Sequence, residues 1–360
     1  MSELAIFDGH NDALTRERYV PLSRPGAGGH INLERMAAGG MRGGIFAVFT
    51  PSPKRSSGPR AGAVEGLRAR TGAQPAVSGA PVPEPSTPAE VSMREAAELA
   101  TIAAGRLFAL EREGALAVAR GVADLDAARR GAGPPVAVLH LEGAEAIDPA
   151  LEALELWYAA GLRSLGPVWS RPNAFAHGVP FRFPGSPDSG PGLTAAGVAL
   201  VRRCAELGVM VDLSHMNEAG FWDVARLELG PLIASHSGAH ALCPASRNLT
   251  DAQLDAIASS GGLVGVVFAC KFLRADFIDD EDTPLTAIVA HARYIAERIG
   301  AEHVALGSDF DGATVPRQLG SAAGLPRLVE ALRAAGFSAE ELEAICWGNW
   351  RRVLGAWWSA

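Results

Sequence analysis

The sequence predicts an α/β fold of the (β/α)8 TIM-like barrel type, in which eight parallel strands alternate with helices. The first observation is a set of eight short apolar runs, at residues 4–7, 43–49, 135–141, 162–169, 208–214, 231–235, 261–269 and 303–308. Most of these runs are continuous rather than alternating, as in strands that are covered on both faces. The second observation is that helical patterns lie between most of the runs, which favours a closed parallel barrel over an open sheet.

Three of the intervening helices have clear boundary signals. Ser92 and Glu95 form a capping box before a long amphipathic segment. A second helix is expected over residues 194–208, because a glycine at its end favours a left-handed stop. A third opens with another capping box at Ser338 and continues into the tryptophan-rich C-terminus.

The chain is expected to be one catalytic domain over residues 1–360, with one insertion. Residues 51–90 are rich in Pro, Gly, Ser and Ala, which is typical of a long surface excursion after the second strand. Residues 170–192 form a second irregular stretch, with aromatic residues and a histidine. Because it follows the fourth strand, we expect this stretch to be a loop over the barrel mouth.

Composition excludes several classes of partner. The formal net charge of -8 makes a nucleic acid an improbable partner, because its phosphates repel an acidic surface. No apolar stretch approaches the roughly 20 residues that cross a bilayer. The first residues do not resemble a secretory signal, and the four cysteines lack CxxC spacing. These features predict a cytoplasmic protein with reduced thiols and no membrane partner.

Polar residues gather where the predicted strands end. Residues at the carboxyl ends of barrel strands are neighbours in space, whatever their separation in sequence. Three histidines and four carboxylates occupy these positions: His10, Asp12, Glu142, His215, His236, Asp309 and Asp311. Buried charges are costly unless they are compensated, and a divalent cation compensates them. The pattern therefore predicts a metal site.

The number of candidate ligands favours two ions. Five ligands (His10, Asp12, Glu142, His215 and His236) exceed the three that one catalytic zinc normally takes from protein. Imidazole with carboxylate suits zinc, with cobalt or manganese as substitutes. The two lysines, Lys54 and Lys271, are badly placed to be a carbamylated bridge, so Glu142 is the better bridging ligand. Two ions so bridged would hold a hydroxide that attacks a carbonyl.

Three residues near the ligands have candidate roles in the reaction. Asp309 is free of ligation in this count, so it is expected to move the proton from the hydroxide to the leaving amine. Asp311 is expected to cap a turn instead. Arg247 follows His236 on one loop and could pair with a substrate carboxylate. Residues expected to orient the ligands are Asp8, Asp212 and His240.

Five motifs in order resemble the membrane (renal) dipeptidase family of zinc metallopeptidases, in its bacterial, unanchored branch. They are "DGHND", "LEGAEAID", "VDLSH", "SHSGAHALCPASRN" and "GSDFDG". The resemblance implies a (β/α)8 barrel with two zinc ions and Glu142 as the bridge. The other implied ligands are His10 and Asp12 for one ion and His215 and His236 for the other.

The resemblance also implies the activity, which is hydrolysis of dipeptides, with D-residues often accepted at the second position. Asp309 matches the family's proton-transfer aspartate, and Arg247 matches the arginine that grips the terminal carboxylate. Two positions depart from the family pattern. Trp169 stands where the best-studied members have a histidine that supports the tetrahedral intermediate, and Ala269 replaces a tyrosine. Candidates to replace that histidine, on the same loop, are Asn173 and His177.

Alternatives remain open at this point. Another binuclear amidohydrolase of the same architecture could act on a lactone, a cyclic amide or a non-dipeptide amide. A metal-binding barrel could also recognise a ligand without turnover. Barrels of this kind frequently pair, so a homodimer is a further expectation. The tryptophans of the C-terminal segment could pack into the core or against a second subunit: Trp347, Trp350, Trp357 and Trp358.

Overall fold

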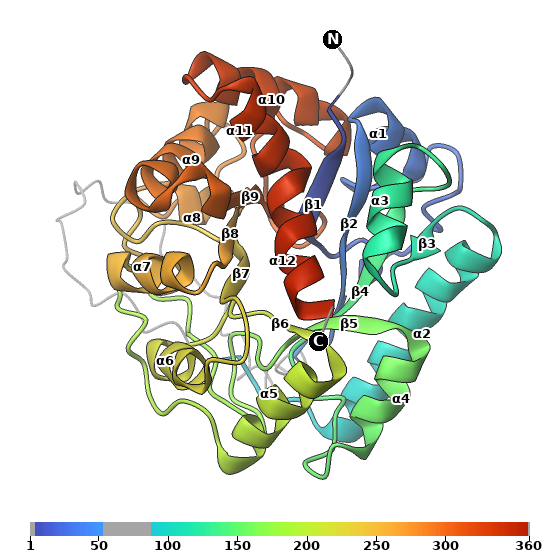
Figure 1. Ribbon diagram of the computed structural model, residues 1–360, viewed down its shortest axis with the longest axis vertical. Coiled ribbons are helices and arrows are strands. Elements are labelled where there is room, and N and C mark those ends of the chain that lie inside the picture. The colour runs from blue at the N-terminus through green and yellow to red at the C-terminus, as the bar shows by residue number, and fades with distance from the viewer. Residues whose placement is uncertain (1–3, 53–87, 359–360) are drawn as a thin grey trace, which may run out of the picture.

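Parallel strands lie at the centre of the molecule, and helices surround them (Figure 1). The computed structural model describes residues 4–52 and 88–358. The larger sheet has the order β1 (Ile6–Asn11), β2 (Met41–Phe49), β4 (Val136–Glu142), β5 (Leu162–Gly166) and β6 (Met210–Val211), and β3 (Ala117–Val118) pairs with β4. The smaller sheet has the order β7 (Ile233–Ser237), β8 (Leu263–Val266) and β9 (Val304–Leu306). All the strand pairs of these sheets are parallel.

Isolated parallel bridges join the two sheets at both edges. Asn11 at the end of β1 pairs with Phe310, which follows β9. Asp212, which follows β6, pairs with Ile233 at the start of β7. The backbone N–H of Asp12 donates to the carbonyl of Phe310 at 2.8 Å. The parallel strands therefore form a curled layer, in which each of the eight predicted apolar runs contributes a strand.

The helices cover the outside of this layer (Figure 1). They are α1 (Leu33–Ala38), α2 (Met93–Arg112), α3 (Val122–Arg129), α4 (Glu152–Ala160), α5 (Ala195–Leu207), α6 (Glu218–Leu227), α7 (Asp251–Ser259), α8 (Cys270–Leu273), α9 (Leu285–Ile299), α10 (Leu325–Ala334), α11 (Ala339–Glu343) and α12 (Asn349–Trp358). The predicted capping boxes at Ser92 and Ser338 are both present, and Gly208 ends α5 with a φ of 69°. The predicted C-terminal helix differs in one respect, because a π-helical turn at Ala344–Gly348 separates α11 from α12. Such a turn inserts an extra residue and shifts the phase of the apolar face.

The C-terminal tryptophans pack into the core of their own chain. Trp347 and Trp350 are buried, with ring centroids 5.5 and 5.8 Å from that of Phe7 on β1. The indole N–H of Trp350 donates to the carbonyl of Leu306 on β9 at 2.9 Å. The indole N–H of Trp357 donates to the carbonyl of Pro231 at 3.1 Å. Of the two arrangements that the sequence left open, the structure therefore has the first.

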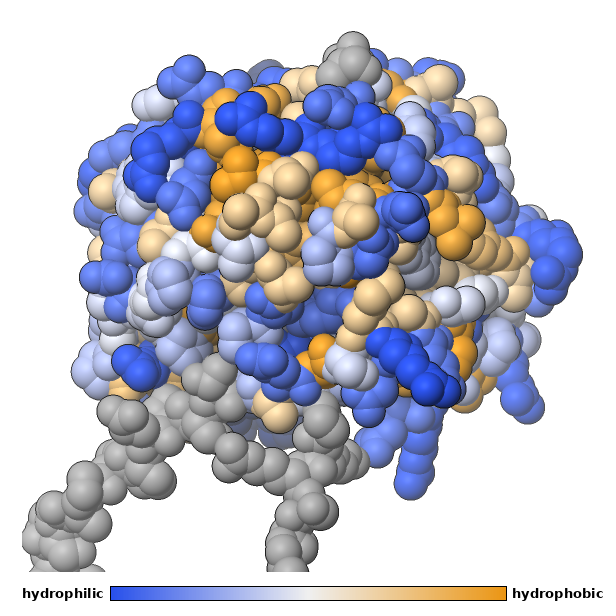
Figure 2. Space-filling view, turned by 90° about the horizontal axis from the view of Figure 1, so that it is seen from below, coloured by the Kyte–Doolittle hydropathy of each residue, from blue (hydrophilic) through white to orange (hydrophobic). Residues whose placement is uncertain are grey.

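Two expectations concern the outside of the molecule. Most of the predicted insertion at 51–90 lies outside the described residues. Among the described helices, none combines the length and the apolar character that crossing a bilayer requires. Figure 2 shows one face of the molecule, on which hydrophilic residues predominate and hydrophobic residues gather in the upper part.

Gly9 in the middle of β1 is a position where the fold requires a glycine. A Cβ atom there would lie 2.7 Å from the carbonyl oxygen of Leu306 and 2.8 Å from that of Ser235, and it would also collide with the ring of Trp350. Backbone atoms of two strands cannot move aside as a flexible side chain can. We therefore expect Gly9→Ala to lower the free energy of unfolding by about 1–3 kcal/mol, the usual cost of overpacking. Urea denaturation followed by tryptophan fluorescence measures this change.

Gly105→Ala is the matched control, because Gly105 lies in α2 and a Cβ there meets nothing within 4 Å. That substitution should raise the free energy of unfolding by about 0.5–1 kcal/mol, since alanine favours a helix interior. Equal stability of the Gly9→Ala variant and the wild type would contradict the close packing of β1 against β7, β9 and α12.

Candidate active site

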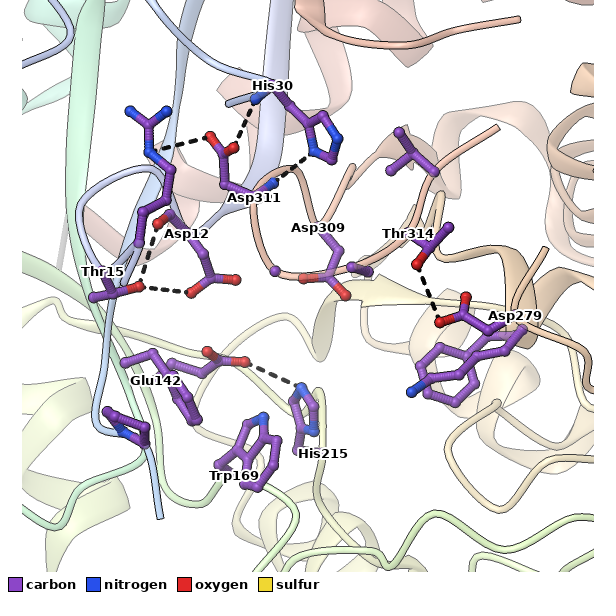
Figure 3. A pocket seen from close by; sticks show the side chains of 18 of the residues that line it. Asp12, Thr15, His30, Glu142, Trp169, His215, Asp279, Asp309, Asp311 and Thr314 are labelled. Carbon is purple, nitrogen blue, oxygen red and sulfur yellow. Dashed lines mark hydrogen bonds and ion pairs between the residues drawn. The ribbon is translucent and has the colours of Figure 1, made fainter. Parts of the chain in front are cut away.

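A pocket of about 910 Å³ opens at the carboxyl ends of the strands. Each strand of the curled layer except the short β3 contributes to its lining, directly or through the segment that follows it. In strand order from β1 to β9, these residues are Asp12, Phe49, Glu142, Trp169, His215, Arg247, Lys271 and Asp309. Figure 3 shows Asp12, Glu142, Trp169, His215 and Asp309 around this pocket. The parallel topology thus brings together residues that are almost 300 positions apart in sequence.

Glu142 lies at the centre of the polar cluster. Its Oε1 atom is 3.1 Å from Nε2 of His215 and 3.6 Å from Nε2 of both His10 and His236. The Nε2 atoms of His215 and His236 are 3.0 Å apart. One carboxylate oxygen is therefore within reach of three imidazoles.

The five predicted metal ligands lie together in two overlapping groups. One group is His10, Asp12 and Glu142, and the other is Glu142, His215 and His236; within each, the candidate ligand atoms lie within 4.8 Å of one another. His10 Nε2 is 3.7 Å from Asp12 Oδ2, as expected for two residues that alternate to the same side of a strand. Glu142 is the member common to both groups.

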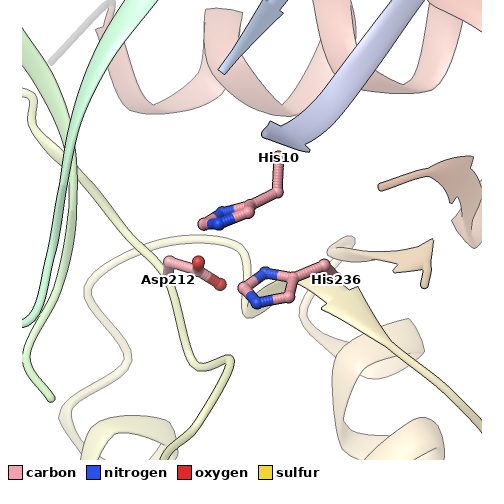
Figure 4. Close-up of side chains that lie close together, drawn as sticks. All are labelled: His10, Asp212 and His236. Carbon is pink, nitrogen blue, oxygen red and sulfur yellow. The ribbon is translucent and has the colours of Figure 1, made fainter. Parts of the chain in front are cut away.

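A third group joins His10 and His236 to Asp212 (Figure 4). The carboxylate of Asp212 is already engaged, because it accepts hydrogen bonds from the hydroxyl of Ser235 at 2.5 Å and from the backbone N–H of Ser235 and Ser214. We therefore assign Asp212 an orienting role rather than a place among the ligands.

The electrostatics of the cluster suit a cation. Neither ring nitrogen of His10 has a hydrogen-bond partner among the described residues, although His10 is fully buried. Burial alone would lower the pKa of His10, but the negative charges of Glu142 and Asp12 raise it to about 10. Burial raises the pKa of the Glu142 carboxyl well above its usual range. The cluster thus attracts a positive charge, which a proton or a metal ion can supply.

The other two histidines are neutral and well oriented. Burial, and then the positive charge near them, lowers the pKa of both His215 and His236 well below the ordinary value. Nδ1 of His215 is hydrogen-bonded to the hydroxyl of Ser170 at 2.8 Å, and Nδ1 of His236 to the hydroxyl of Ser235 at 2.8 Å. These bonds leave Nε2 of each ring facing Glu142. A hydrogen bond on one nitrogen fixes which nitrogen is free to bind a metal.

The residues expected to orient the ligands differ in outcome. Asp212 reaches His236 through Ser235, as described above. Asp8 accepts hydrogen bonds from the backbone N–H and the hydroxyl of Ser308, both at 2.8 Å. The single hydrogen of that hydroxyl is shared with the carbonyl of His10, whose oxygen is 3.0 Å from Ser308 Oγ. His240 has another partner, because its Nε2 is hydrogen-bonded to the carbonyl of Gly185 at 2.8 Å, and its expected orienting role stays a prediction.

Asp309 lies beside the metal-ligand cluster, and Asp311 has a different environment. Asp309 lines the pocket, and its backbone N–H donates to the carbonyl of His10 at 3.0 Å. Burial and the neighbouring Asp12 carboxylate raise the pKa of Asp309 to about 7, a value suited to proton transfer near neutral pH. Asp311 accepts hydrogen bonds from the backbone N–H of His30 at 2.6 Å and of residue 31 at 3.2 Å, so it ties two loops together.

Arg247 is a buried cation with unused donors. Its Nη1 donates to the hydroxyl of Ser237 and its Nη2 to the carbonyl of His236, both at 2.7 Å. Its Nε–H has no partner among the described residues, and the side chain lines the pocket. The two bonds leave three of the five guanidinium N–H groups for an anion.

The loop after β5 is placed differently from the expectation. Trp169 lines the pocket, with its ring centroid 5.7 Å from that of His215 and 5.0 Å from that of Phe49. Asn173 and His177 are not among the residues that line it. The amide of Asn173 donates to the carbonyl of Pro167 and accepts from backbone N–H groups of its own loop, so it holds the loop together.

Several residues around the pocket were not predicted from the sequence. His140 lies two residues before Glu142 on β4, and the alternation of strand side chains is a signal that could have found it. Its Nε2 is 3.8 Å from Asp212. Ser170 and Ser235 adjoin candidate residues, but single serines carry no sequence signal. Lys271 lies on the short helix α8, which follows β8 and is too short to leave a periodic signal in the sequence.

Comparison with known proteins agrees with this geometry. Residues 1–357 match the family model "Membrane dipeptidase (Peptidase family M19)". The chain is 55% identical over 221 residues to an uncharacterized protein of Klebsiella pneumoniae encoded in the pqqA 5′ region, covering 61% of this chain and 82% of that protein.

Two crystal structures resemble the whole chain. One is a metallopeptidase from Rhodobacter sphaeroides liganded with a phosphinate mimic of the dipeptide L-Ala-D-Ala; it is 41% identical, with a TM-score of 0.87 over 99% of this chain and 100% of that chain. The other is a dipeptidase of family M19, also described as a metallopeptidase; it is 41% identical, with a TM-score of 0.86 over the full length of both chains.

Proposed function

This chain belongs to the membrane dipeptidase family, peptidase family M19, and is a dipeptidase; we propose that it works with two zinc ions bridged by Glu142. The observation that carries the proposal is the position of Glu142, whose carboxylate is shared by the two groups of candidate ligands. The mixture of imidazole and carboxylate suits zinc, and cobalt or manganese would be substitutes. When bound, the ions would supply the activated water and polarise the peptide carbonyl.

The chain's own residues would bind the dipeptide and move the proton. Arg247 would hold the free terminal carboxylate through its unused N–H groups. Asp309 would accept the proton of the attacking water and deliver it to the leaving amine, a role that its place in the pocket lining beside the ligand cluster favours. Trp169 would form an apolar wall beside the scissile bond. The L-Ala-D-Ala mimic in the Rhodobacter relative supports acceptance of a D-residue at the second position.

Four broader predictions accompany this function. We propose that the curled layer is a closed (β/α)8 barrel, supported by the bridges of Asn11 and Asp212, and that the chain is one catalytic domain.

The four free, buried cysteines are consistent with the expected cytoplasmic location. The homodimer stays a prediction, and exposed apolar side chains on α2 and α4, such as Ile102 and Leu156, are candidates for its contact surface.

Glu142→Ala tests the bridge directly. Removing a ligand common to both groups should lower the affinity for both ions. The loss should exceed the roughly 10–100-fold loss of metal affinity that follows when a residue supporting a ligand is changed. We expect about two zinc ions in the wild type and fewer than one in the variant, measured by elemental analysis after passage through metal-free buffer. Asp311→Asn, which changes a pocket carboxylate outside both groups, should keep two. A Glu142→Ala protein that retains two tightly bound ions would refute the bridging role.

Asp309→Asn tests the proton transfer. The amide is nearly isosteric with the carboxyl but cannot accept the proton, so kcat for L-Ala-D-Ala should fall by about 10²–10⁴-fold. Zinc content should not change, because Asp309 is outside both ligand groups. Steady-state kinetics and elemental analysis on the same preparation provide the two measurements. Near-full activity in this variant would show that another group carries the proton.

Arg247→Ala distinguishes a dipeptidase from an amidohydrolase of lactones or cyclic amides. Loss of the charge-assisted bonds to a carboxylate should reduce kcat/KM for L-Ala-D-Ala by about 10–100-fold, mainly through KM. A dipeptide amide, which lacks the carboxylate, should be a poor substrate of the wild type and change little in the variant. Arg247→Lys keeps the positive charge and loses the planar guanidinium group, so its kcat/KM for L-Ala-D-Ala should lie between those of the wild type and of Arg247→Ala. If Arg247→Ala lowered kcat/KM equally for L-Ala-D-Ala and for the dipeptide amide, Arg247 would not be the group that recognises the carboxylate.

A further inference from the structure

Lys271 is a cation that lines the pocket, and it has no acidic partner among the residues that the structure describes. It lies on α8, and its Nζ is 5.0 Å from the ring centroids of both Phe181 and Phe272. Among the described residues, no carboxylate oxygen forms an ion pair with Nζ. The two aromatic faces attract the ammonium group and limit its motion, but they do not neutralise it. Its N–H groups are therefore available to an anion in the pocket.

The acidic side chains that follow Lys271 along the same segment have other partners. Asp276, the nearest of them in sequence, forms an ion pair with Arg274. Glu281 forms an ion pair with Arg317, and Asp279 accepts a hydrogen bond from the hydroxyl of Thr314 at 3.1 Å (Figure 3). Both also line the pocket. Neither of these carboxylates forms an ion pair with Lys271, so its ammonium group has no direct acidic partner among the described residues.

Lys271 shares this wall with Arg247. The side-chain amide of Asn248, next to Arg247, donates to the carbonyl of Phe272 at 2.9 Å. The thiol of Cys243 donates to the carbonyl of Lys271 at 3.6 Å. The loops after β7 and β8 are therefore fastened together, and the two cations line the same pocket from adjacent loops.

Lys271 is also near the reacting centre. Burial has the largest effect on the pKa of His215 and on that of Asp309. The positive charges of Lys271 and Arg247 each act to lower both pKa values. A dipeptide whose terminal carboxylate is held by Arg247 has the side chain of its second residue next to that carboxylate. That side chain is then the part of the substrate placed to meet Lys271.

We propose, building on the dipeptidase function above, that Lys271 binds an acidic side chain on the C-terminal residue of the dipeptide. The enzyme then prefers dipeptides that end in Glu or Asp over those that end in the corresponding amides. A carboxylate offers the ammonium group a charge-assisted hydrogen bond, which is stronger than the bond to a neutral amide. The partly dehydrated position between two aromatic rings strengthens the attraction further.

The test compares Lys271→Met with the wild type on L-Ala-D-Glu and L-Ala-D-Gln, which differ only in side-chain charge. Methionine keeps the apolar contacts with the two rings and removes the charge. We expect the wild type to favour the Glu substrate in kcat/KM, and the Glu-to-Gln ratio to fall by about tenfold or more in the variant. Lys271→Arg should keep most of the preference. Calorimetric binding of the two corresponding phosphinate mimics gives a second readout, in which the ratio of dissociation constants should change in parallel.

Arg274→Met is the matched control. Arg274 is three residues after Lys271 and forms an ion pair with Asp276, and neither residue lines the pocket. The substitution removes one positive charge, as Lys271→Met does. It should leave the Glu-to-Gln ratio unchanged. An active Lys271→Met enzyme with the wild-type ratio would overturn the proposal for Lys271 while leaving the dipeptidase function intact. A zinc-loaded wild type that neither cleaves nor binds any dipeptide would overturn the function and, with it, this inference.

Discussion

The buried carboxylate of Glu142 is the constraint on which the site depends. A negative charge in this position has lost most of its hydration, and three imidazoles within 3.6 Å of one oxygen surround it. Two of those imidazoles are neutral because burial lowers their pKa, so they offer lone pairs rather than positive charge. Such an assembly is unfavourable by itself, since the carboxylates of Asp12 and Asp309 add to the negative charge. It becomes favourable when cations share the ligands, which explains why so many charged groups can be buried together.

The scaffold holds this assembly through short links between backbone and ligand. The hydroxyl of Ser308 joins Asp8 to the carbonyl of His10, and the N–H of Asp309 donates to the same carbonyl. The end of β1 is thereby fixed to the segment after β9, at the place where the two sheets meet. Gly9, one residue before His10, lets β1 approach β9 and the Trp350 ring closely. The close packing below the site and the geometry of the ligands above it are thus consequences of the same few residues.

The sequence predicts the strands and the ligands better than it predicts the loops. Buried parallel strands give continuous apolar runs, and their carboxyl ends converge, so His10, Glu142 and His236 could be grouped without coordinates. The two-residue strand β3 and the π-helical turn before α12 depend on tertiary contacts and leave no periodic signal. The expected roles of Asn173 and His177 stay predictions, and neither residue is among those that line the pocket. Their loop is irregular and gives no periodic signal, and the Asn173 amide is hydrogen-bonded within it.

The distribution of charge around the pocket has a consequence for how a substrate binds. The carboxylates at the ligand cluster, Asp12, Glu142 and Asp309, come from β1, β4 and the segment after β9. Arg247 and Lys271 follow β7 and β8, on a side of the pocket that Asp279 and Glu281 also line. A dipeptide is a zwitterion, with its amino group and its terminal carboxylate at opposite ends. The two cations attract the carboxylate end, and the acidic residues attract the amino end, before any short-range contact forms. Trp169 adds an apolar face to the lining, so in the proposed binding mode the charges at the two ends of the substrate would set its orientation. The peptide bond between those ends would then lie over the cluster around Glu142.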